Sequence, residues 1–453
     1  MNLSSVRLSR RKLLGASAAA AAVTIVPRHA VAGSGSTPPS EKLNLAFIGV
    51  GGRGIKNLEG LAGQNFVAFA DVDQDRAAMS LKQHPDVPVQ QDFRKMLDEF
   101  DSRIDGVVIS TPDHTHAVAA LDAMRRGKHV YCEKPLAHCI GEVRALREAA
   151  RRHRVTTQLG NQGHSAEHIR LFCEWVWDGA IGDVHTIHAG RWSDGRYTAI
   201  GNLARLQETH AVPEGLDWDL WLGPAAQRPY HPLYIPQWWR AWAPFGTGEI
   251  GDWTCHIVDP VFWALDLGSP KTVTAEVQGF DPKLHADTFP VGMHVRYEFA
   301  ANGKRGPVTL NWYNGTWALP PIPEIADEKL PKNTYAIVLG TKGAIRYGSH
   351  GASGVRIMPE EKMLAYKRPE PSIPRVPDHH TDWVRAIREG RPAGSNFDYG
   401  GPLTELALLG VIASRFPGVK LEWNGEAARF ANCDEANAMV NPPAREGWSF
   451  EIG

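Results

Sequence analysis

Three side chains near the middle of the chain have types and spacing suited to moving a proton: Asp252, His256 and Asp259. Residues four apart on a helix share one face. Asp252 and His256 are therefore predicted to lie together at the start of a helix over residues 252–265, with Asp259 one turn further on. A carboxylate that orients an imidazole makes a general base, because the imidazole accepts the proton. Two alternatives stay open, a metal site and a capped helix with a buried histidine, although three ligands from one helix rarely converge on a metal without others.

A second chemically suited group is Glu133-Lys134-Pro135, which ends the strand predicted over residues 129–132. Pro135 fixes the course of the chain and so the direction of the lysine beside it. A strand-end lysine by itself is usually solvated. If it lies next to His256, Lys134 would donate a hydrogen bond to the substrate oxygen that gives its proton to His256. It would then stabilise the negative charge that develops on that oxygen.

The segment Gly49-Val50-Gly51-Gly52-Arg53-Gly54 follows a predicted buried strand and opens a predicted helix, the context that a dinucleotide-binding fingerprint requires. Gly49 permits a tight turn, Gly51 lets a pyrophosphate approach the backbone, and Gly54 allows close packing of helix and strand. The residues predicted to bind the cofactor here and on neighbouring strand ends are Gly49, Gly51, Gly52, Arg53, Gly54, Thr111, Pro112, His116, Glu133 and Lys134.

The identity of the cofactor is predicted from Asp71, at the end of the second predicted strand. An acidic residue about 20 positions after the fingerprint binds the ribose hydroxyls, and its charge repels a 2′-phosphate. NAD is therefore the expected cofactor, while Arg76 leaves NADP open. A turn-forming role for Asp71 is the alternative, and Asp73 could share the ribose.

The elements that position these residues follow from short apolar runs alternating with helical stretches. Strands are predicted over residues 44–49, 66–72, 87–90, 104–110, 129–132 and 155–159, and helices over 73–81, 93–100, 114–126 and 140–153. This alternation indicates a parallel, doubly wound Rossmann sheet, an NAD(P)-binding domain over residues 43–163. Ligands bind at the carboxyl ends of such strands, where the glycine segment, Thr111 and Lys134 stand.

After residue 163 the pattern predicts an α/β (α+β) domain with an open, mostly antiparallel sheet. Its strands are expected over residues 184–192, 272–277, 292–299, 308–313, 336–339 and 344–347, and helices over 166–177 and 252–265. Residues 164–375 are assigned to this substrate and oligomerisation domain. Residues 376–453, with helices over 378–389 and 402–415 and an irregular tail, are expected to complete it.

A long stretch without periodicity, residues 203–248, is rich in tryptophan and proline, which is typical of a functional loop or an interface arm. Indole faces suit the apolar faces of sugar rings, but they also fill cores. The stretch therefore predicts either a carbohydrate-lined cleft or aromatic packing. Candidate substrate contacts in the second domain are His164, Arg191, Trp192, Trp239 and Asp259.

The N-terminus carries Ser9-Arg10-Arg11-Lys12, an alanine-rich apolar stretch and a small-residue cleavage site before Gly33. This pattern predicts a twin-arginine signal over residues 1–32 and a linker over 33–42, hence a periplasmic protein that the Tat translocase exports folded. The apolar stretch is too short to span a bilayer, so no stable membrane anchoring is expected.

Composition excludes several function classes. The chain has 49 basic and 50 acidic residues and no basic cluster after the signal, so nucleic acid is not an expected partner. Its five cysteines are scattered, which predicts neither a disulfide framework nor a cysteine metal site. No bound metal is expected.

The glycine segment, Glu133-Lys134-Pro135 and the Asp252/His256 pair together resemble the glucose–fructose oxidoreductase/inositol dehydrogenase (Gfo/Idh/MocA) family. The resemblance extends over essentially the whole chain after the signal, including residues 340–343 (GTKG) and 401–405 (GPLTE). It implies a Rossmann domain, an open-sheet domain that often forms dimers or tetramers, and Lys134, Asp252 and His256 as the catalytic group. Residues 161–165 (NQGHS) are similar to a stretch of an exported subgroup, which implies that His164 reaches the substrate.

Three functions stay open. The first is an NAD(P)-dependent oxidoreductase that acts on a hydroxyl of a sugar, a sugar derivative or a cyclitol. The second is an NAD-dependent glycosidase or lyase that oxidises C3, eliminates and re-reduces, as in glycoside hydrolase family 109, whose members resemble this chain but tend to lack Glu-Lys-Pro. The third is a non-catalytic carbohydrate-binding protein. Since free nicotinamide cofactor belongs to the cytoplasm, an exported enzyme is expected to hold its cofactor tightly and to run a self-contained redox cycle.

Overall fold

The computed structural model describes residues 42–193, 195–325 and 333–448. The predicted signal and most of the linker lie outside these residues. In the described part, six strands form one parallel sheet in the order β3-β2-β1-β4-β5-β6. This order is that of dinucleotide-binding folds, and the first strands are buried apolar runs because helices cover both faces. The strands are β1 (Asn44–Ile48), β2 (Asn65–Ala70), β3 (Val89–Gln90), β4 (Gly106–Ile109), β5 (His129–Cys132) and β6 (Thr157–Leu159).

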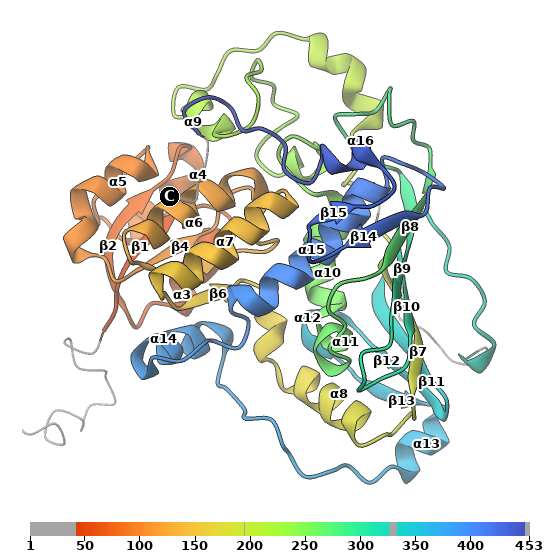
Figure 1. The fold of residues 1–453 in the computed structure, drawn as a ribbon. Coiled ribbons are helices and arrows are strands. Elements are labelled where there is room, and N and C mark those ends of the chain that lie inside the picture. Colours follow the sequence, from red (N-terminus) through yellow and green to blue (C-terminus); the bar gives the residue numbers. More distant parts are fainter. Residues whose placement is uncertain (1–41, 194, 326–332, 449–453) are drawn as a thin grey trace, which may run out of the picture. The chain divides into compact units, whose positions relative to one another are not determined.

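The helices of this domain connect successive strands and lie at the left of Figure 1. Apolar side chains on one face of each helix meet the sheet, as Met96 and Leu97 of α5 do. The helices are α3 (Arg53–Gly60), α4 (Gln74–Gln83), α5 (Phe93–Phe100), α6 (His116–Arg125) and α7 (Ile140–His153). The prediction of a Rossmann sheet is confirmed.

The remaining described strands form a nine-stranded sheet in the order β13-β12-β11-β7-β10-β9-β8-β14-β15. Neighbours are antiparallel except β7 and β10, so the prediction of an open, mostly antiparallel sheet is also confirmed. The strands are β7 (Val184–Arg191), β8 (Thr272–Gln278), β9 (Gly292–Phe299), β10 (Val308–Gly315), β11 (Thr334–Gly340), β12 (Gly343–Tyr347), β13 (Arg356–Met358), β14 (Leu421–Asn424) and β15 (Arg429–Phe430).

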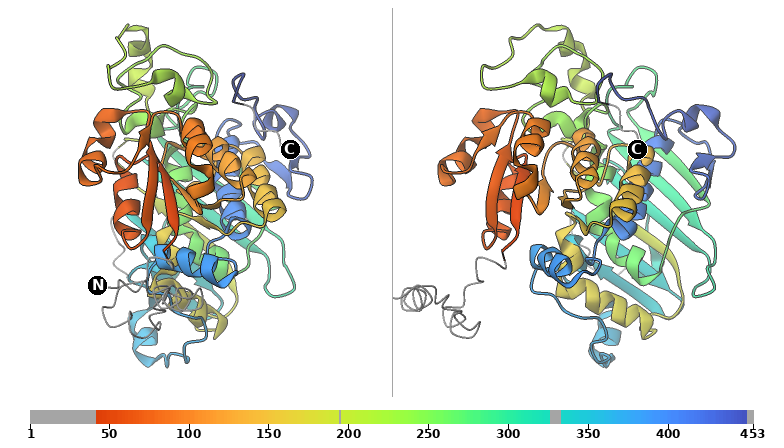
Figure 2. Two further views of the ribbon diagram at one scale, coloured as in Figure 1. Left: turned by 90° about the vertical axis from the view of Figure 1, so that its left-hand side faces the viewer. Right: turned by 60° about the vertical axis from the view of Figure 1, so that its left-hand side comes forward.

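A layer of helices separates the two sheets, as Figures 1 and 2 show. It contains α8 (Glu167–Trp177), α10 (Gly248–Ile257), α11 (Asp259–Ala264) and α15 (Phe397–Ala413). One hydrophobic cluster runs through the layer, from Val143 on α7 through Leu408 on α15 to Val295 on β9. The two domains therefore share a core across their boundary, which fixes the helix layer against the Rossmann sheet.

Two predicted helices have different bounds. The single helix expected over residues 252–265 is two helices, because Pro260 cannot continue α10 and instead occupies the first turn of α11. α10 also begins at Gly248, so Asp252 lies one turn inside it rather than at its start. α15 begins at Phe397, before Pro402, which the structure accommodates inside the helix.

Helix α14 (His379–Glu389) packs against the Rossmann sheet, at the lower left of Figure 1. Trp383 is fully buried there with Phe47, Phe69 and Tyr131. The segment after residue 376 therefore contributes to the first domain as well as to the second, which the expected boundary did not include. Apolar periodicity predicts a packed helix face but not the sheet that receives it.

The irregular segment 195–247, called the arm below, connects β7 to α10. It contains the turn η6 (Ile200–Gln207), the short helix α9 (Trp218–Leu222) and the turn η7 (Trp238–Ala241). A local core of Trp218, Trp221, Tyr234, Trp242 and Phe245 holds it together. In the described part of the chain, no helix has both the length and the apolar character needed to cross a membrane.

Candidate active site

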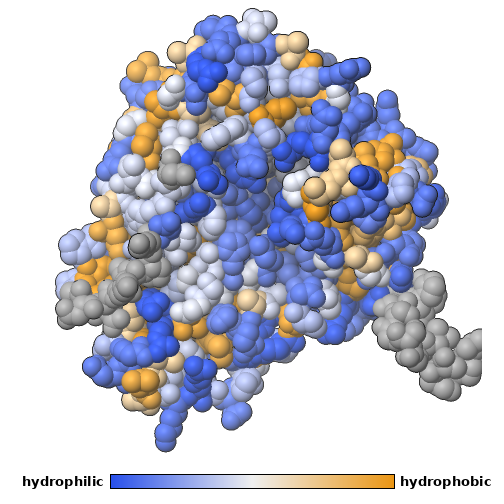
Figure 3. Space-filling model, turned by 180° about the vertical axis from the view of Figure 1, so that it is seen from behind, coloured by the Kyte–Doolittle hydropathy of each residue, from blue (hydrophilic) through white to orange (hydrophobic). Residues whose placement is uncertain are grey.

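A cavity of about 1180 Å³ lies along the carboxyl edge of the Rossmann sheet and extends to the arm and α10. Seen from behind in Figure 3, the molecule is hollowed between its two lobes, and hydrophilic residues gather in the hollow. The predicted site residues that line the cavity are Gly49, Gly51, Gly52, Arg53, Asp71, Thr111, Pro112, Glu133, Lys134, Trp239, Asp252 and His256.

The glycine segment leaves room for a phosphate at the N-terminus of α3. Gly49 and Gly52 have φ of 81° and 53°, a backbone region that favours glycine. A Cβ on Gly51 would lie 2.7 Å from the backbone oxygen of Arg76, and one on Gly54 would lie 2.2 Å from that of Gly49. Gly54 thus serves helix–strand packing rather than the cavity wall. Backbone N–H groups at a helix N-terminus suit an anion, so this loop fits a dinucleotide pyrophosphate.

Asp71, directly after β2, supports the glycine segment. One of its oxygens accepts hydrogen bonds from the backbone N–H groups of Val50 at 2.9 Å and Gly51 at 3.3 Å, and the other accepts from that of Asp73 at 3.0 Å. Burial raises the pKa of Asp71, and these amides oppose the rise. One lone pair of the carboxylate, on the oxygen that accepts from Asp73, remains for a ribose hydroxyl. Asp73 instead caps α4, because it accepts from the N–H of Arg76 at 3.1 Å.

Lys134 and Asp252 form the centre of the other end of the cavity. Lys134 Nζ donates to Asp252 Oδ1 and, at 3.1 Å, to the backbone oxygen of Asp252. The Tyr197 hydroxyl donates to Asp252 Oδ2 at 2.5 Å, and Arg240 Nε lies 3.5 Å from Oδ1. Burial alone would raise the pKa of Asp252, but Lys134 and Arg240 hold it well below its ordinary value. Asp252 is therefore an anion held by two cations and a hydroxyl.

His256 does not pair with Asp252, so the predicted carboxylate–imidazole dyad is wrong. Among the described residues, its buried Nδ1 has no hydrogen-bond partner. The ring instead stacks on His350, with centroids 4.1 Å apart, and meets the ring of Trp253 at 5.8 Å. The physical reason is competition, because a buried carboxylate is stabilised more by cations than by a neutral imidazole.

The environment of His256 keeps its imidazole neutral. Burial, followed by the charge of Lys134 and by His350, lowers the pKa of His256 well below its ordinary value. A neutral ring has a free lone pair at neutral pH and is ready to accept a proton. Lys134 and His256 thus meet at the cavity with the two functions that alcohol oxidation needs, a donor for the oxygen and an acceptor for its proton.

Sequence reasoning missed His350, which comes from the second domain. It lies in the short turn α12 (Ser349–Ala352), where His350, Gly351 and Ala352 have φ of 56°, 83° and 61°. Left-handed backbone at non-glycine residues is strained, and such strain collects at functional sites. Gly163 makes room for this turn, because a Cβ on it would lie 2.2 Å from the backbone carbonyl carbon of His350. The one signal in the sequence was a histidine beside a glycine after a strand. Tyr197 and Arg240, in the arm without periodicity, were missed as well.

Glu133 joins the glycine segment to the end of the cavity that carries Lys134. Its Oε1 accepts hydrogen bonds from Arg53 Nε at 2.8 Å and from Asn57 Nδ2 at 3.0 Å. Arg53 also donates to Gln162 Oε1 at 3.4 Å, which places the 161–165 motif beside the cavity. Glu133 and Arg53 therefore hold the start of α3 against the end of β5, where Lys134 follows.

His116 lies beside the cavity without lining it. Its Nδ1 is 2.8 Å from the backbone oxygen of Pro135 and its Nε2 is 2.9 Å from that of Thr111. It is buried, so its ring braces the loops after β4 and β5 instead of meeting the cofactor directly.

His164 and Asp259, both predicted to contact substrate, lie together outside the cavity lining. His164 Nδ1 is 3.0 Å from Asp259 Oδ1, Asn161 donates to Asp259 Oδ2 at 3.1 Å, and Tyr399 also donates to Asp259. The start of α11 turns Asp259 away from the face that carries Asp252. His164 is buried with it, stacked on Trp263 at 4.5 Å.

Arg191 and Trp192 also lie outside the cavity lining, on opposite faces of the sheet, because side chains alternate along a strand. Arg191 lies over the Trp253 ring at 3.8 Å and 3.4 Å from Glu249. Trp192 stacks on Tyr335 with centroids 4.7 Å apart, on the face away from the helices. The side chains of Arg191 and Trp192, both predicted to contact substrate, therefore pack against other side chains of the protein.

The tryptophans of the arm combine the two predicted roles. Trp221, Trp238, Trp239 and Trp242 line the cavity, and all but Trp238 also belong to the aromatic core of the arm. The side chain of Trp238 is 53% exposed. The ring of Trp239 is instead covered by the guanidinium of Arg240, which lies 4.1 Å from the ring centroid. Aromatic packing therefore shapes the arm, and one edge of that packing faces the site.

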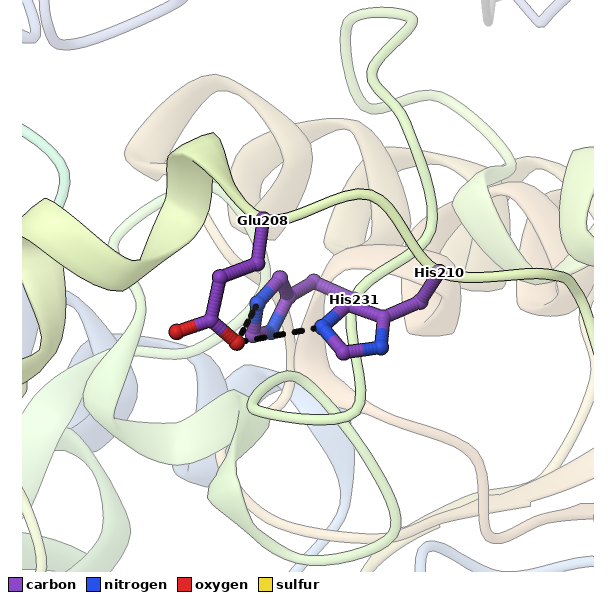
Figure 4. Close-up of side chains that lie close together, drawn as sticks. All are labelled: Glu208, His210 and His231. Atoms are coloured by element: carbon purple, nitrogen blue, oxygen red, sulfur yellow. Dashed lines mark hydrogen bonds and ion pairs between the residues drawn. The ribbon is translucent and has the colours of Figure 1, made fainter.

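Glu208, His210 and His231 bring three possible metal ligands together in the arm (Figure 4). His231 Nδ1 accepts a hydrogen bond from the N–H of Leu233 at 3.1 Å, so the ring proton lies on Nε2, which is 3.1 Å from the backbone oxygen of Arg205. A metal ion at Nε2 would displace this proton and leave two donors facing each other at Nδ1. The cluster is therefore a hydrogen-bonded clamp, in which His210 Nε2 lies 3.3 Å from Glu208 Oε2.

Comparisons with known proteins match both domains. Gfo/Idh/MocA family models described as "Oxidoreductase family, NAD-binding Rossmann fold" and "Oxidoreductase family, C-terminal alpha/beta domain" match residues 43–161 and 190–305. An inositol 2-dehydrogenase of Rubrobacter xylanophilus is 32% identical over 32% of this chain and 42% of its own length. Glycosyl hydrolase family 109 protein 1 of a Shewanella species (strain ANA-3) is 31% identical over 34% of this chain and 37% of its own. The matches thus span less than half of these relatives.

Solved structures resemble the whole fold. GenD2 from gentamicin A biosynthesis, in complex with NAD, has a TM-score of 0.58 at 21% identity and covers 88% of this chain and 100% of its own. The aldose-aldose oxidoreductase from Caulobacter crescentus, complexed with glycerol, has a TM-score of 0.56 at 17% identity, with 84% and 100% covered. At these identities the likeness shows the fold, and the first family model shows an NAD-binding Rossmann domain.

Proposed function

Because this chain belongs to the Gfo/Idh/MocA oxidoreductase family, we propose that it oxidises a hydroxyl group of a sugar, a sugar derivative or a cyclitol. The observation that carries the proposal is the meeting of Lys134, Asp252, Tyr197 and His256 at one end of a cavity whose other wall is the glycine segment. NAD, when bound, supplies the hydride acceptor.

The residues at this end divide the remaining work of the reaction. Oxidation of a secondary alcohol removes a hydride from carbon and a proton from oxygen. Neutral His256 accepts the hydroxyl proton, since its lowered pKa keeps it unprotonated. Lys134 donates a hydrogen bond to the same oxygen and stabilises its negative charge. Asp252 holds the Lys134 ammonium in place, and Tyr197 and Arg240 hold Asp252.

The test compares Lys134→Ala and His256→Ala with exposed controls, Lys271→Ala and His168→Ala. We expect the site variants to keep NAD affinity and to lose turnover by about 100-fold or more in a sugar and cyclitol screen followed by nicotinamide absorbance, because one positioned donor or base contributes about that much. Normal turnover in both site variants would refute the catalytic assignment.

A redox-neutral glycosidase is a second candidate, in which the ketone formed at C3 permits elimination of the glycosidic bond. Such a cycle needs more proton-transfer groups than simple oxidation, and Tyr197 and His350 lie within contact of Asp252 and His256. The relatives named as family 109 glycosyl hydrolases favour the same candidate. Incubation with aryl glycosides and no added NAD distinguishes the two. Release of aglycone without net reduction of the cofactor indicates the glycosidase, and reduction without release indicates the oxidoreductase.

We propose further that the Arg10-Arg11 signal exports the folded protein with its cofactor to the periplasm. Arg10→Lys combined with Arg11→Lys is expected to leave the protein in the cytoplasm on fractionation. Retention of NAD through dialysis of the exported protein would support tight binding, and rapid loss would contradict it.

Self-association is proposed through the sheet face away from the helices. There, the rings of Tyr313 and His294 stack with centroids 4.7 Å apart, and His188 lies on the other side of Tyr313 at 5.9 Å. Light scattering of the purified protein is expected to give the mass of a dimer or a tetramer. Glu substituted for His294 should lower that mass, and an unchanged mass would exclude this face.

A further inference from the structure

The C-terminal segment after α16 (Asp434–Asn437) returns from the second domain toward the Rossmann domain, as the dark-blue chain beside α9 shows in Figure 1. Its course is fixed at two points. Val440 accepts a hydrogen bond from the N–H of Gly141, at the start of α7, at 2.8 Å. Arg445 then donates its own N–H to the backbone oxygen of Pro224 at 2.9 Å. Residues 438–448 are called the strap below.

Arg445 anchors the strap to α9 through its guanidinium. It donates to the backbone oxygens of Gly223 at 2.8 Å and Asp219 at 2.9 Å, and to side-chain oxygens of Asp219 and Gln227 at 2.5 Å each. Charged hydrogen bonds of this kind are among the stronger ones in proteins. A single arginine therefore holds the end of the strap on the arm.

The anchored strap places Trp448 in the wall of the cavity. Trp448 is 8% exposed and lines the cavity, as do Gln91, Phe93 and Thr115, and its ring lies 6.3 Å from that of Phe93. The guanidinium of Arg94 lies over its ring at 4.3 Å. This indole therefore joins the Rossmann loops after β3 and β4 to the arm.

The sheet order identifies which part of the cofactor Trp448 faces. Phe93 follows β3, which is an edge strand of the sheet. Lys134 follows β5, and β2, β1 and β4 lie between these two strands. Asp71 follows β2 and is the residue for the adenosine ribose. The wall beyond Asp71, on the β3 side, is therefore where the adenine base lies when the nicotinamide faces Lys134 and His256.

We infer that the strap forms the outer wall of an adenine subsite and that Trp448 retains the cofactor by closing the groove over the base. The inference rests on the proposed retention of NAD and adds the residues that cause it. The inference predicts an effect that the glycine segment alone does not produce. Loss of the strap should release the cofactor while leaving Lys134, Asp252 and His256 in place.

The test measures equilibrium binding of AMP to the cofactor-free protein and the dissociation rate of NAD from the loaded protein. Trp448→Ala is compared with Trp448→Phe, Arg445→Met and an exposed neighbour, Glu446→Gln. We expect Trp448→Ala and Arg445→Met to weaken AMP binding by about 10-fold and to raise the NAD dissociation rate by a similar factor, since one aromatic contact to a base is worth that much. Trp448→Phe should retain most of the affinity, and Glu446→Gln should match the wild type.

A matched thermal unfolding of the cofactor-free variants separates binding from folding. AMP affinity and NAD dissociation within twofold of the wild type in both Trp448→Ala and Arg445→Met would overturn the inference. If Trp448→Ala does not fold, Arg445→Met decides it by the same criterion. Because no sugar enters these measurements, failure of the proposed reaction would leave the result unchanged, and the two failures are distinguishable.

Discussion

Replacement of Glu249 by glutamine tests how strongly the start of α10 perturbs a buried carboxyl group. Glu249 lies three residues before Asp252 and is 3% exposed. Its carboxylate accepts hydrogen bonds from Ser193 Oγ at 3.0 Å and from the N–H of Gly315 at 3.2 Å, and Arg191 lies 3.4 Å away. Burial raises the pKa of Glu249 from 4.5 to about 7, and the contacts with Ser193 and Arg191 only partly oppose it.

The sign and size of the effect follow from proton linkage. Between the unfolded pKa of 4.5 and the folded pKa of about 7, the folded protein holds a proton on Glu249 that the unfolded chain has lost. The free energy of unfolding therefore falls as pH rises through this window and levels off above it. A shift of this size corresponds to about 3 kcal/mol. Glutamine does not titrate, and its amide oxygen can accept one of the same hydrogen bonds.

The assay is urea unfolding of the wild type and Glu249→Gln across pH values from about 5 to about 8, the range over which this group titrates. We expect the stability of the variant relative to the wild type to rise by about 2.5 kcal/mol from the acidic to the alkaline end, because all other groups cancel in the difference. The exposed Glu361→Gln serves as the control. A constant difference for Glu249→Gln would refute the reasoning, since Glu249 would then titrate as it does in water.

Three further predictions concern the cofactor loop, the His350 turn and helix α14. Asp71→Ala removes the acceptor of three backbone N–H groups and should weaken NAD binding by about 10- to 100-fold in calorimetry, whereas the exposed Asp75→Ala should not. Gly163→Ala forces the His350 backbone to move and should lower kcat by about 10-fold or more with NAD affinity unchanged, and an unchanged kcat would show that His350 does not position His256. Trp383→Ala should lower the free energy of unfolding of the cofactor-free protein by about 3–5 kcal/mol, and a loss below about 1 kcal/mol would mean that α14 does not belong to the Rossmann core.

Local pattern was sufficient for most of the Rossmann domain. The runs 44–49 and 129–132 are apolar after their first residues, Asn44 and His129, as expected of strands covered on both faces, and β1 and β5 follow them closely. The helices over 93–100 and 140–153 were predicted with their observed bounds, because their apolar spacing and flanking turn residues act within one segment. The predicted ends of the strands also located Thr111 and Lys134 correctly at the cavity.

The same reasoning could not assign partners between distant segments. Spacing placed Asp252 and His256 on one helix, but the direction of each side chain depends on Lys134, Tyr197 and His350, which lie far away in the sequence. Asp259 has helical spacing from Asp252 in the sequence. In the structure a second helix, with Pro260 in its first turn, begins at Asp259, so this residue does not continue the face of Asp252. β13, β14 and β15 were missed since each is only two to four residues long and is held by a neighbouring strand.

The charges around Asp252 bear on the proposed role of His256 as the proton acceptor. Lys134 and Arg240 bring two positive charges to the carboxylate of Asp252. The charge on Lys134 lowers the pKa of His256, which makes the imidazole a weaker base. The same charge lowers the pKa of a substrate hydroxyl bound to Lys134, because it stabilises the anion that forms. Proton transfer depends on the difference between the pKa of the substrate hydroxyl and the pKa of His256. Because Lys134 lowers both, the weaker basicity of His256 is offset, and the unliganded imidazole stays neutral.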